Sequence, residues 1–214
     1  MVTIKTDLRA RFSGARDQGQ RPTCIAFAIS DGHAAERAPY VNLSTDYLYF
    51  YGLKCMPANH GDNGISLPAA TAALMADGQP LETDWPYSKV LPSALSKWSP
   101  PSGLKVMRAK IVSGPSTIDA VCSALDRGQP TILIFRSSER FHHAAADGFL
   151  PGRAKDGSLG LHAVVAAGHG VKVGTRHVLV RNSWGIGWGD QGYAWLAEDY
   201  LSPRLSSVNS LQAV

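Results

Sequence analysis

The sequence predicts an α+β fold, with helices in the first half of the chain and strands of one antiparallel sheet in the second half. Apolar residues recur at helical spacing in residues 23–38, whereas short runs rich in β-branched and aromatic residues follow from Thr131 onward. The chain has 214 residues, of which 44% are hydrophobic, so it is long enough to bury a sizeable core. Helices followed by strands in this way are typical of the α+β class.

Three segments are expected to form helices, and each is closed by a proline or a glycine. Residues 23–38 have few helix breakers before Pro39, and Cys24 falls at the start of this helix. Residues 66–77 carry a proline in the first turn and are followed by a glycine suited to a C-cap. Residues 118–127 end in the same way, at Gly128.

Four later runs are expected to be strands of one sheet: residues 131–135, 162–167, 177–181 and 193–196. The proline-rich residues 91–103 and the glycine-rich residues 147–160 are expected to be loops. We expect a single domain of residues 1–214, with a helical lobe at about residues 12–105 and a β lobe at about residues 106–214. The boundary is placed near residues 100–112, so a site that combines Cys24 with His162 would lie at the seam.

Four residues suited to acyl transfer occur along the chain. Gln18 and Cys24 lie in the segment Asp-Gln-Gly-Gln-Arg-Pro-Thr-Cys-Ile-Ala-Phe, and His162 lies in Gly-Leu-His-Ala-Val-Val. Asn182 opens the segment Asn-Ser-Trp-Gly-Ile-Gly-Trp-Gly-Asp-Gln-Gly-Tyr, which combines glycines, two tryptophans and an amide side chain. This combination indicates a hydrolase site built around a cysteine.

In order and spacing, these motifs resemble those of the papain-like (C1 family, cathepsin-type) cysteine peptidases, and the resemblance spans nearly the whole chain. Residues 43–48, 62–67 and 82–87 are also similar to segments of that family, most of all to its short bacterial branch. The resemblance implies a papain-like two-lobe fold with the active site in the cleft between the lobes. It also implies hydrolysis of peptide bonds by an endopeptidase that needs no metal or organic cofactor.

The resemblance gives each of the four residues a role. Cys24 would attack the substrate carbonyl and form an acyl-thioester, with His162 as general base and then general acid. Asn182 would orient His162, and the side-chain amide of Gln18 would donate a hydrogen bond to the oxyanion. Because a free thiol is only slightly ionised at neutral pH, Cys24 needs this base and the positive end of a helix.

Six residues are expected to contact the substrate: Asn63, Gly64, Ile65, Leu161, Trp184 and Trp188. Gly64 would let an extended peptide approach the backbone of the cleft wall closely. Trp184 would cover the hydrogen bond between Asn182 and His162 and exclude water from it.

The sequence departs from the family pattern at several positions. Ile25 replaces a tryptophan, Ile65 replaces the second of two glycines, and Leu161 replaces an acidic or amide residue. Arg21 and Asp62 stand where secreted relatives carry the two halves of a disulfide. These departures leave the shape of the substrate pockets and the pH optimum open.

Three cysteines, Cys24, Cys55 and Cys122, are an odd and sparse set, which favours a reducing compartment over a disulfide framework. No pair of Cys or His residues has the short spacing of a structural zinc site, so neither a metal nor a cofactor is expected. The N-terminus lacks the apolar run of a secretory signal, and no apolar stretch approaches the roughly 20 residues that span a bilayer. We therefore expect a cytoplasmic protein, with delivery outside the cell by a non-standard route left open.

The net charge is +4, and the basic residues are scattered, so neither nucleic acid nor a membrane is expected as a partner. The expected partner is a peptide or protein substrate, and control by an inhibitor or a propeptide is left open. Four further histidines lack matched partners and are assigned to the surface or to packing: His142, His143, His169 and His177. His33 and His60 are left undecided.

Two other functions stay open at this level. Interception of the thioester by an amine would make the protein a transpeptidase or ligase, and mass spectrometry of the products would show it. A papain-like module that binds peptides without turnover is the other alternative, and the departures at Ile25, Ile65 and Leu161 are its basis.

Overall fold

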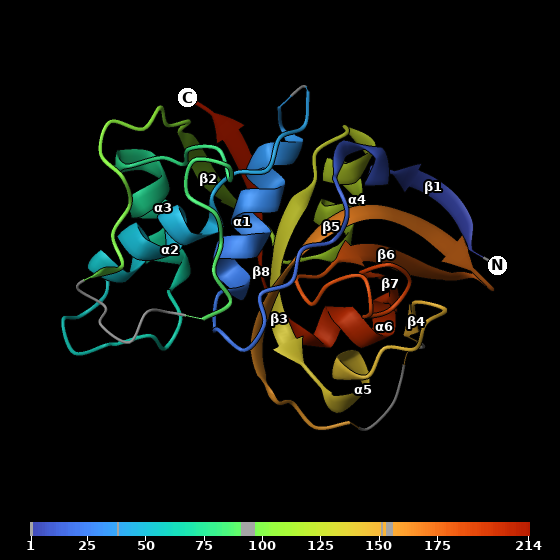
Figure 1. The fold of residues 1–214 in the computed structure, drawn as a ribbon. Helices are drawn as coiled ribbons and strands as arrows, with labels where there is room; N and C mark the ends of the chain where they lie inside the picture. The colour runs from blue at the N-terminus through green and yellow to red at the C-terminus, as the bar shows by residue number, and fades with distance from the viewer. Residues whose placement is uncertain (1, 38, 91–96, 151, 153–155) are drawn as a thin grey trace.

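The computed structural model describes residues 2–37, 39–90, 97–150, 152 and 156–214. Its helices and its sheet lie in two adjoining parts, with α1, α2 and α3 on one side and most of the strands on the other (Figure 1). The predicted α+β class is confirmed. Residues 91–96, 151 and 153–155 lie outside the described residues, so the two predicted loops at 91–103 and 147–160 are described only in part.

The helical part contains α1 (Cys24–Ala35), α2 (Thr45–Lys54) and α3 (Leu67–Ala76). The side chains of Ser44 and Ser66 cap the last two helices by accepting hydrogen bonds from backbone N–H groups in the first turn. After α3, Gly78 adopts a φ of +72°, as a C-cap requires. The predicted helices at 23–38 and 66–77 therefore form with ends shifted by one to three residues, because end residues serve as caps.

The strands form one sheet in the order β2-β8-β3-β5-β6-β7-β4, and β1 pairs with β5. All the pairings are antiparallel except that of β4 with β7. The strands are β1 (Thr3–Asp7), β2 (Ala109–Gly114), β3 (Thr131–Ser137), β4 (Phe149–Leu150), β5 (Gly160–Lys172), β6 (Thr175–Arg181), β7 (Tyr193–Ala197) and β8 (Leu205–Ala213). The four predicted strands correspond to β3, β5, β6 and β7, and β4 falls inside a predicted loop.

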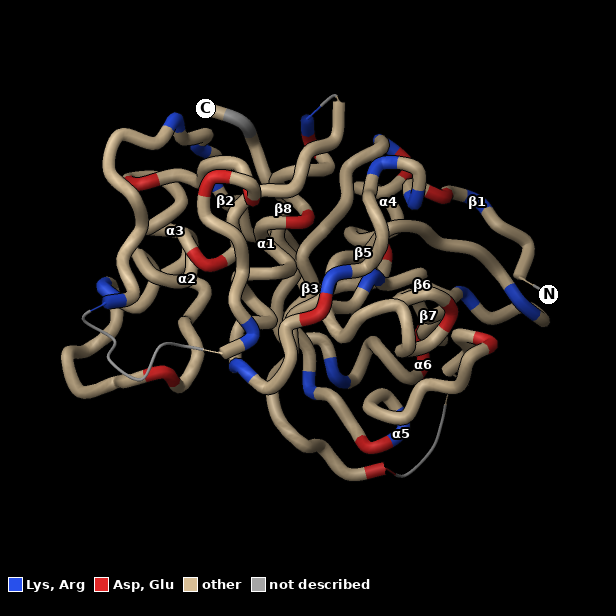
Figure 2. Tube along the Cα trace, viewed as in Figure 1, with Lys and Arg blue, Asp and Glu red and all other residues tan. Residues whose placement is uncertain are grey.

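Short helices complete the part of the chain that the structure describes: η1 (Arg9–Arg11), α4 (Ile118–Asp126), α5 (Glu139–His142), α6 (Glu198–Leu201) and η3 (Ser202–Arg204). The predicted helix at 118–127 is α4, followed by Gly128 with a φ of +75°. Among the described residues, no helix is both long and apolar enough to cross a membrane. Basic and acidic residues are interspersed over both parts of the trace (Figure 2).

The core lies on both faces of the sheet. On one face, buried residues of α1, α2 and α3 pack with Ile132, Val165 and Leu211 of the sheet. On the other face, α4 and α6 pack with residues such as Leu133 and Val164. Neighbouring residues of one strand thus serve different cores, so β3 and β5 carry nearly continuous apolar runs.

A buried ionic group joins α1 to the sheet. Asp31 of α1 accepts from Arg16 at 2.6 Å and from Arg181 of β6 at 2.7 Å. Arg181 also donates to the carbonyl oxygens of Ser13 and Gly14 at 2.8 and 2.9 Å. The loop that leads to Gln18 is therefore fixed to the strand that leads to Asn182.

Candidate active site

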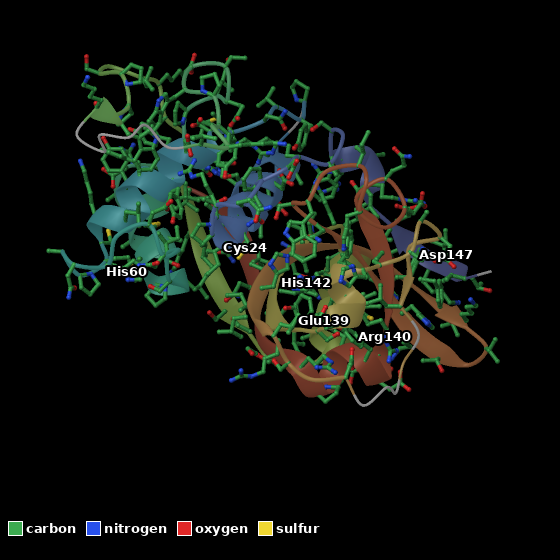
Figure 3. All side chains as sticks on the ribbon, turned by 60° about the horizontal axis from the view of Figure 1, so that its bottom comes forward. Cys24, His60, Glu139, Arg140, His142 and Asp147 are labelled. Atoms are coloured by element: carbon green, nitrogen blue, oxygen red, sulfur yellow. The ribbon has the colours of Figure 1, made fainter. Side chains whose placement is uncertain are left out.

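Cys24 is the first residue of α1, and it is partly exposed. The preceding Thr23 does not cap the helix with its side chain, because its hydroxyl bonds to the hydroxyl of Tyr87 at 2.9 Å. The first backbone N–H groups of α1 thus remain free to donate hydrogen bonds to the Cys24 sulfur. Figure 3 shows Cys24 at the start of α1, with His60 and His142 on either side of it in that view.

His162 lies on β5, with its ring held by Asn182. The two side chains meet through His162 Nε2 and Asn182 Oδ1 at 2.8 Å, and the backbone N–H of Ser183 donates to the same oxygen at 2.9 Å. An atom that accepts from a backbone N–H must be the amide oxygen, so His162 Nε2 must be the donor. This tautomer leaves Nδ1 without a proton and able to take one from a thiol.

The loop that carries Gln18 runs antiparallel to the segment after Asn182. The backbone N–H of Gln18 donates to the carbonyl of Ser183 at 2.8 Å, and that of Gly185 donates to the carbonyl of Arg16 at 2.9 Å. The Gln18 side chain is buried, with Oε1 accepting from Ser183 Oγ at 2.6 Å and Nε2 donating to the carbonyl of Arg21 at 2.7 Å. The structure thereby places Gln18 between the start of α1 and the segment that holds His162.

The turn after Asn182 needs glycines for this pairing. Gly192 adopts a φ of +87°, and a Cβ built on it would lie 2.1 Å from the Cβ of Ala15. Its carbonyl accepts the backbone N–H of Asn182 at 2.9 Å. A side chain at this position would push the Gln18 loop away from the residue that orients His162.

Burial changes the proton affinities of both reactive groups. It raises the pKa of the Cys24 thiol, and the backbone N–H groups of Ala163, Ile25 and Cys24 itself act in the opposite direction. Burial also lowers the pKa of His162 to about 4, against the hydrogen bond to Asn182, and the charge of His142 lowers it further. Each group alone is therefore favoured as neutral, so a thiolate forms when His162 takes the thiol proton and the two new charges stabilise one another.

Aromatic rings surround His162. The Trp184 ring lies 4.7 Å from the imidazole at an interplanar angle of 38°, and the Phe141 ring lies 5.6 Å away. Trp188 is buried behind Trp184, and its Nε1 donates to the carbonyl of Phe141 at 2.9 Å. Trp188 therefore supports Trp184, and the substrate contact that the sequence predicted for it stays a prediction.

A cavity of about 470 Å³ opens beside Cys24 and His162. Six of the predicted site residues line it: Cys24, Asn63, Gly64, Ile65, Leu161 and His162. The remaining walls are mainly apolar and come from Pro22, Ile25, Ser66, Leu67, Ile134 and Ser207. The structure thus brings the two reactive groups to one cavity, whereas Gln18, Asn182, Trp184 and Trp188 are not among its lining residues.

Ile65 lines the cavity, and its side chain points toward α2. It is buried, and its Cδ1 would lie 2.7 Å from a Cβ built on Gly52 of α2. The side chain therefore packs into the notch that Gly52 leaves in α2. Leu161, in contrast, is 60% exposed at the rim of the cavity.

Sequence reasoning missed two residues near the site. Arg21 is buried between Gln18 and Cys24 in the chain, and its carbonyl holds the Gln18 amide. His142 of α5 lies with its ring 4.7 Å from that of Trp184, and its charge lowers the pKa of His162. The sequence shows that Arg21 lies three residues before Cys24 but gives it no role, and nothing in the sequence places His142 against Trp184.

Within the described ranges, no group of three or more His, Cys, Asp or Glu residues could hold a metal ion. Cys24, Cys55 and Cys122 are all free thiols.

A cysteine at a helix start that shares a cavity with a strand-borne imidazole, itself bonded to an asparagine, is typical of the papain-like thiol hydrolases. A family model described as papain family cysteine protease matches residues 3–209. The chain therefore belongs to the papain family of cysteine proteases.

Individual relatives are distant in sequence. A cysteine protease of Blomia tropicalis is 24% identical over 210 residues, covering 91% of this chain and 60% of that protein. Cysteine proteinase 3 of Entamoeba histolytica is 27% identical over 207 residues, covering 90% of this chain and 62% of that protein. The chain thus spans about three-fifths of the length of these curated relatives.

Solved structures show the same fold. Xylellain, a cysteine protease from Xylella fastidiosa, superposes with a TM-score of 0.85 at 22% identity, covering 100% of this chain and 87% of that chain. This likeness confirms the papain-like two-lobe fold.

Proposed function

We propose that the protein is a cysteine peptidase that cleaves peptide bonds through an acyl-thioester on Cys24. The observation that carries the proposal is the 2.8 Å hydrogen bond that fixes the tautomer of His162, at a cavity that Cys24 also lines. Membership of the papain family supports the same reaction.

In the acylation step, His162 Nδ1 takes the thiol proton and the Cys24 sulfur attacks the carbonyl carbon of the substrate. The carbonyl oxygen becomes an oxyanion, for which the amide of Gln18 and the backbone N–H of Cys24 are the proposed donors. Collapse of this intermediate breaks the C–N bond, and His162 gives its proton to the leaving amine.

In the deacylation step, water replaces the amine. His162 removes a proton from the water, which attacks the thioester, and the thiol leaves with that proton restored. Trp184 lies against the imidazole throughout, and it keeps bulk water from competing for the bond to Asn182.

The cavity supports a preference for an apolar side chain on the acyl part of the substrate. Its walls include Ile65, Leu67, Ile134 and Leu161, and no Lys, Arg, Asp or Glu lines it among the described residues. A bulky apolar side chain would release water from these walls, whereas a charged one would lose hydration without gaining a partner.

The test is intact-protein mass spectrometry after incubation with a peptidyl epoxide under mild reduction. Wild-type protein should gain one adduct and hydrolyse fluorogenic peptides, Cys24→Ala should gain none, and His162→Ala should react more slowly. A wild-type protein that neither reacts nor cleaves any member of a peptide library would falsify the proposal.

We also propose that the protein works in a reducing compartment such as the cytoplasm. The support is that Cys55 is exposed and Cys122 buried, with neither in a disulfide. Retention of activity at cytosolic thiol potential, with loss after oxidation of Cys24, would agree with this proposal.

A further inference from the structure

A buried arginine lies directly beside the proposed oxyanion donor. The Arg21 cluster consists of Arg21, Asp46, Tyr49, Tyr87 and Trp98. Arg21 Nη1 bonds to Asp46 at 2.6 Å and to the carbonyl of Ser88 at 2.6 Å. The guanidinium carbon lies 5.2, 4.9 and 5.3 Å from the ring centres of Tyr49, Tyr87 and Trp98.

A contribution to the stability of the fold is a weak explanation for the burial of the Arg21 cluster. Arg21 is 5% exposed and Asp46 1% exposed, and a buried ion pair of this kind often adds nothing over apolar residues of equal volume. Nε and Nη2 of Arg21 have no hydrogen-bond partner among the described residues, so the aromatic faces are their surroundings. Because burial of these charges costs solvation without a clear gain in stability, the cluster is better explained by the residues that its members hold in place.

Two members of the cluster hold Gln18 from both sides. The carbonyl of Arg21 accepts from Gln18 Nε2 at 2.7 Å, and the hydroxyl of Tyr87 donates to the carbonyl of Gln18 at 2.8 Å. Ser183 Oγ fixes the other end of the amide by donating to Oε1 at 2.6 Å. Because the amide is planar, fixing Oε1 and one N–H also fixes the direction of the second N–H.

The Tyr87 hydroxyl reaches the helix start as well. It lies 2.9 Å from the hydroxyl of Thr23, the residue before Cys24. One phenol oxygen thus joins the Gln18 loop to the first turn of α1. This contact therefore fixes the position of one proposed oxyanion donor, the Gln18 amide, relative to the other, the backbone N–H of Cys24.

A third member of the cluster holds the cleft wall. The hydroxyl of Tyr49 donates to Asp62 at 2.5 Å and accepts the backbone N–H of Gly64 at 3.1 Å. Tyr49 thereby connects Asp62 with Arg21, whose guanidinium packs on its ring, without a covalent bond.

We propose that Arg21 and Tyr87 are positioning residues that set the direction of the Gln18 amide in the oxyanion site, while Tyr49 sets the cleft wall at Gly64. The proposal rests on the proposed peptidase function. The members of the cluster are therefore expected to have different kinetic effects. Arg21 and Tyr87 position a group that stabilises the transition state, so they act on kcat, whereas Tyr49 positions a wall that binds the substrate, so it acts on KM.

The test uses single hydroxyl deletions in the full chain. Tyr87→Phe should lower kcat about tenfold with little change in KM, less than the loss of 100-fold or more that follows complete removal of an oxyanion donor. Its affinity for a peptide aldehyde, which forms a tetrahedral adduct, should fall by a similar factor. The rate of Cys24 alkylation by iodoacetamide, which forms no oxyanion, should stay within twofold of wild type.

Three further variants complete the comparison. Tyr49→Phe should raise KM several-fold and leave kcat near wild type, and Arg21→Lys should repeat the Tyr87→Phe pattern because lysine keeps the charge but not the planar contact with the rings. Tyr40→Phe, which loses a hydroxyl bond to Asn42 away from the cavity, is the matched control and should change none of these quantities.

Two results would overturn the proposal. One is a Tyr87→Phe variant whose kcat and aldehyde affinity match those of wild type. The other is an equal loss in alkylation, aldehyde binding and turnover, which would mean general loosening of the site. A wild-type protein without turnover would instead overturn the proposed function, before any variant is compared.

Discussion

At the scale of single residues, the direction of one amide decides the chemistry of the site. The backbone N–H of Ser183 determines which atom of Asn182 faces His162, and that atom determines which imidazole nitrogen carries the proton. The hydrogen bond also acts to raise the pKa of His162 against the effect of burial. Asn182 therefore contributes both the orientation and the basicity of the ring.

Replacing Asn182 by alanine should reduce the reactivity of Cys24. Without the acceptor the imidazolium is less stable, so less thiolate is present at a given pH. A hydrogen bond to a charged group contributes about 1.5–3 kcal/mol, which corresponds to a loss of about 10- to 100-fold in kcat/KM. The measurement is the rate of iodoacetamide alkylation at pH 6–7 together with peptide turnover. Alkylation at the wild-type rate would contradict this role.

The four proposed catalytic residues could be found from the sequence because each lies in a short motif with a chemical reason for its residue types. His142 and Arg21 could not be given a role in the same way. His142 acts through contact with Trp184, 42 positions later in the chain, and Arg21 acts through rings contributed by three separate segments. Such contacts depend on tertiary packing, which residue spacing does not encode.

At the scale of elements, apolar periodicity located α1, α3, α4 and the most buried strands, but it missed α2 although six of its residues are buried. Both β3 and β5 are buried along most of their length, so their apolar runs stand out. In β8 the buried apolar residues Val208 and Leu211 are separated by the polar residues Asn209 and Ser210, of which Asn209 is itself buried. β1 is largely exposed, and its pairing with β5 is visible only in the folded chain. The expected lobes at 12–105 and 106–214 do not include this N-terminal strand.

The packing of α2 on the cleft wall predicts a coupling between two positions. Ile65→Ala should destabilise the protein by about 2–4 kcal/mol, because it leaves a cavity against Gly52. Gly52→Ala should bring little or no gain in the parent, since its Cβ would meet Ile65 Cδ1 at 2.7 Å and offset the roughly 1 kcal/mol gain in helix propensity. In the Ile65→Ala background, the same change should stabilise by at least about 1 kcal/mol.

A double-mutant cycle from urea unfolding measures this coupling. Independent effects of the two substitutions would show that the side chain of Ile65 does not occupy the notch in α2. In that case the cleft wall would not be set by this contact.

At the scale of the whole molecule, buried groups join the two parts of the fold and make its stability depend on pH. Asp31 carries its charge between Arg16 and Arg181, and these positive charges lower its pKa. His33 and His162 are also buried, and each of their rings bonds to a side-chain amide. His33 bonds to Gln79 at 3.0 Å in the helical part, His162 lies in the sheet, and burial lowers the pKa of each to about 4.

These two histidines predict a loss of stability in mild acid. In the unfolded chain a histidine has a pKa of about 6.5, so between about pH 6.5 and 4 the unfolded state binds more protons than the native state. Their contribution to the free energy of unfolding is therefore fully present above about pH 6.5 and falls as the pH drops toward 4, by up to roughly 3 kcal/mol for each histidine.

Urea unfolding of Cys24→Ala protein at several pH values measures the slope of the unfolding free energy against pH without self-digestion. Adding His33→Gln should reduce the slope by close to one proton near pH 5. Equal slopes in the parent and the His33→Gln variant would mean that His33 is protonated alike in both states, and the buried pair with Gln79 would then contribute nothing to the acid sensitivity of the fold.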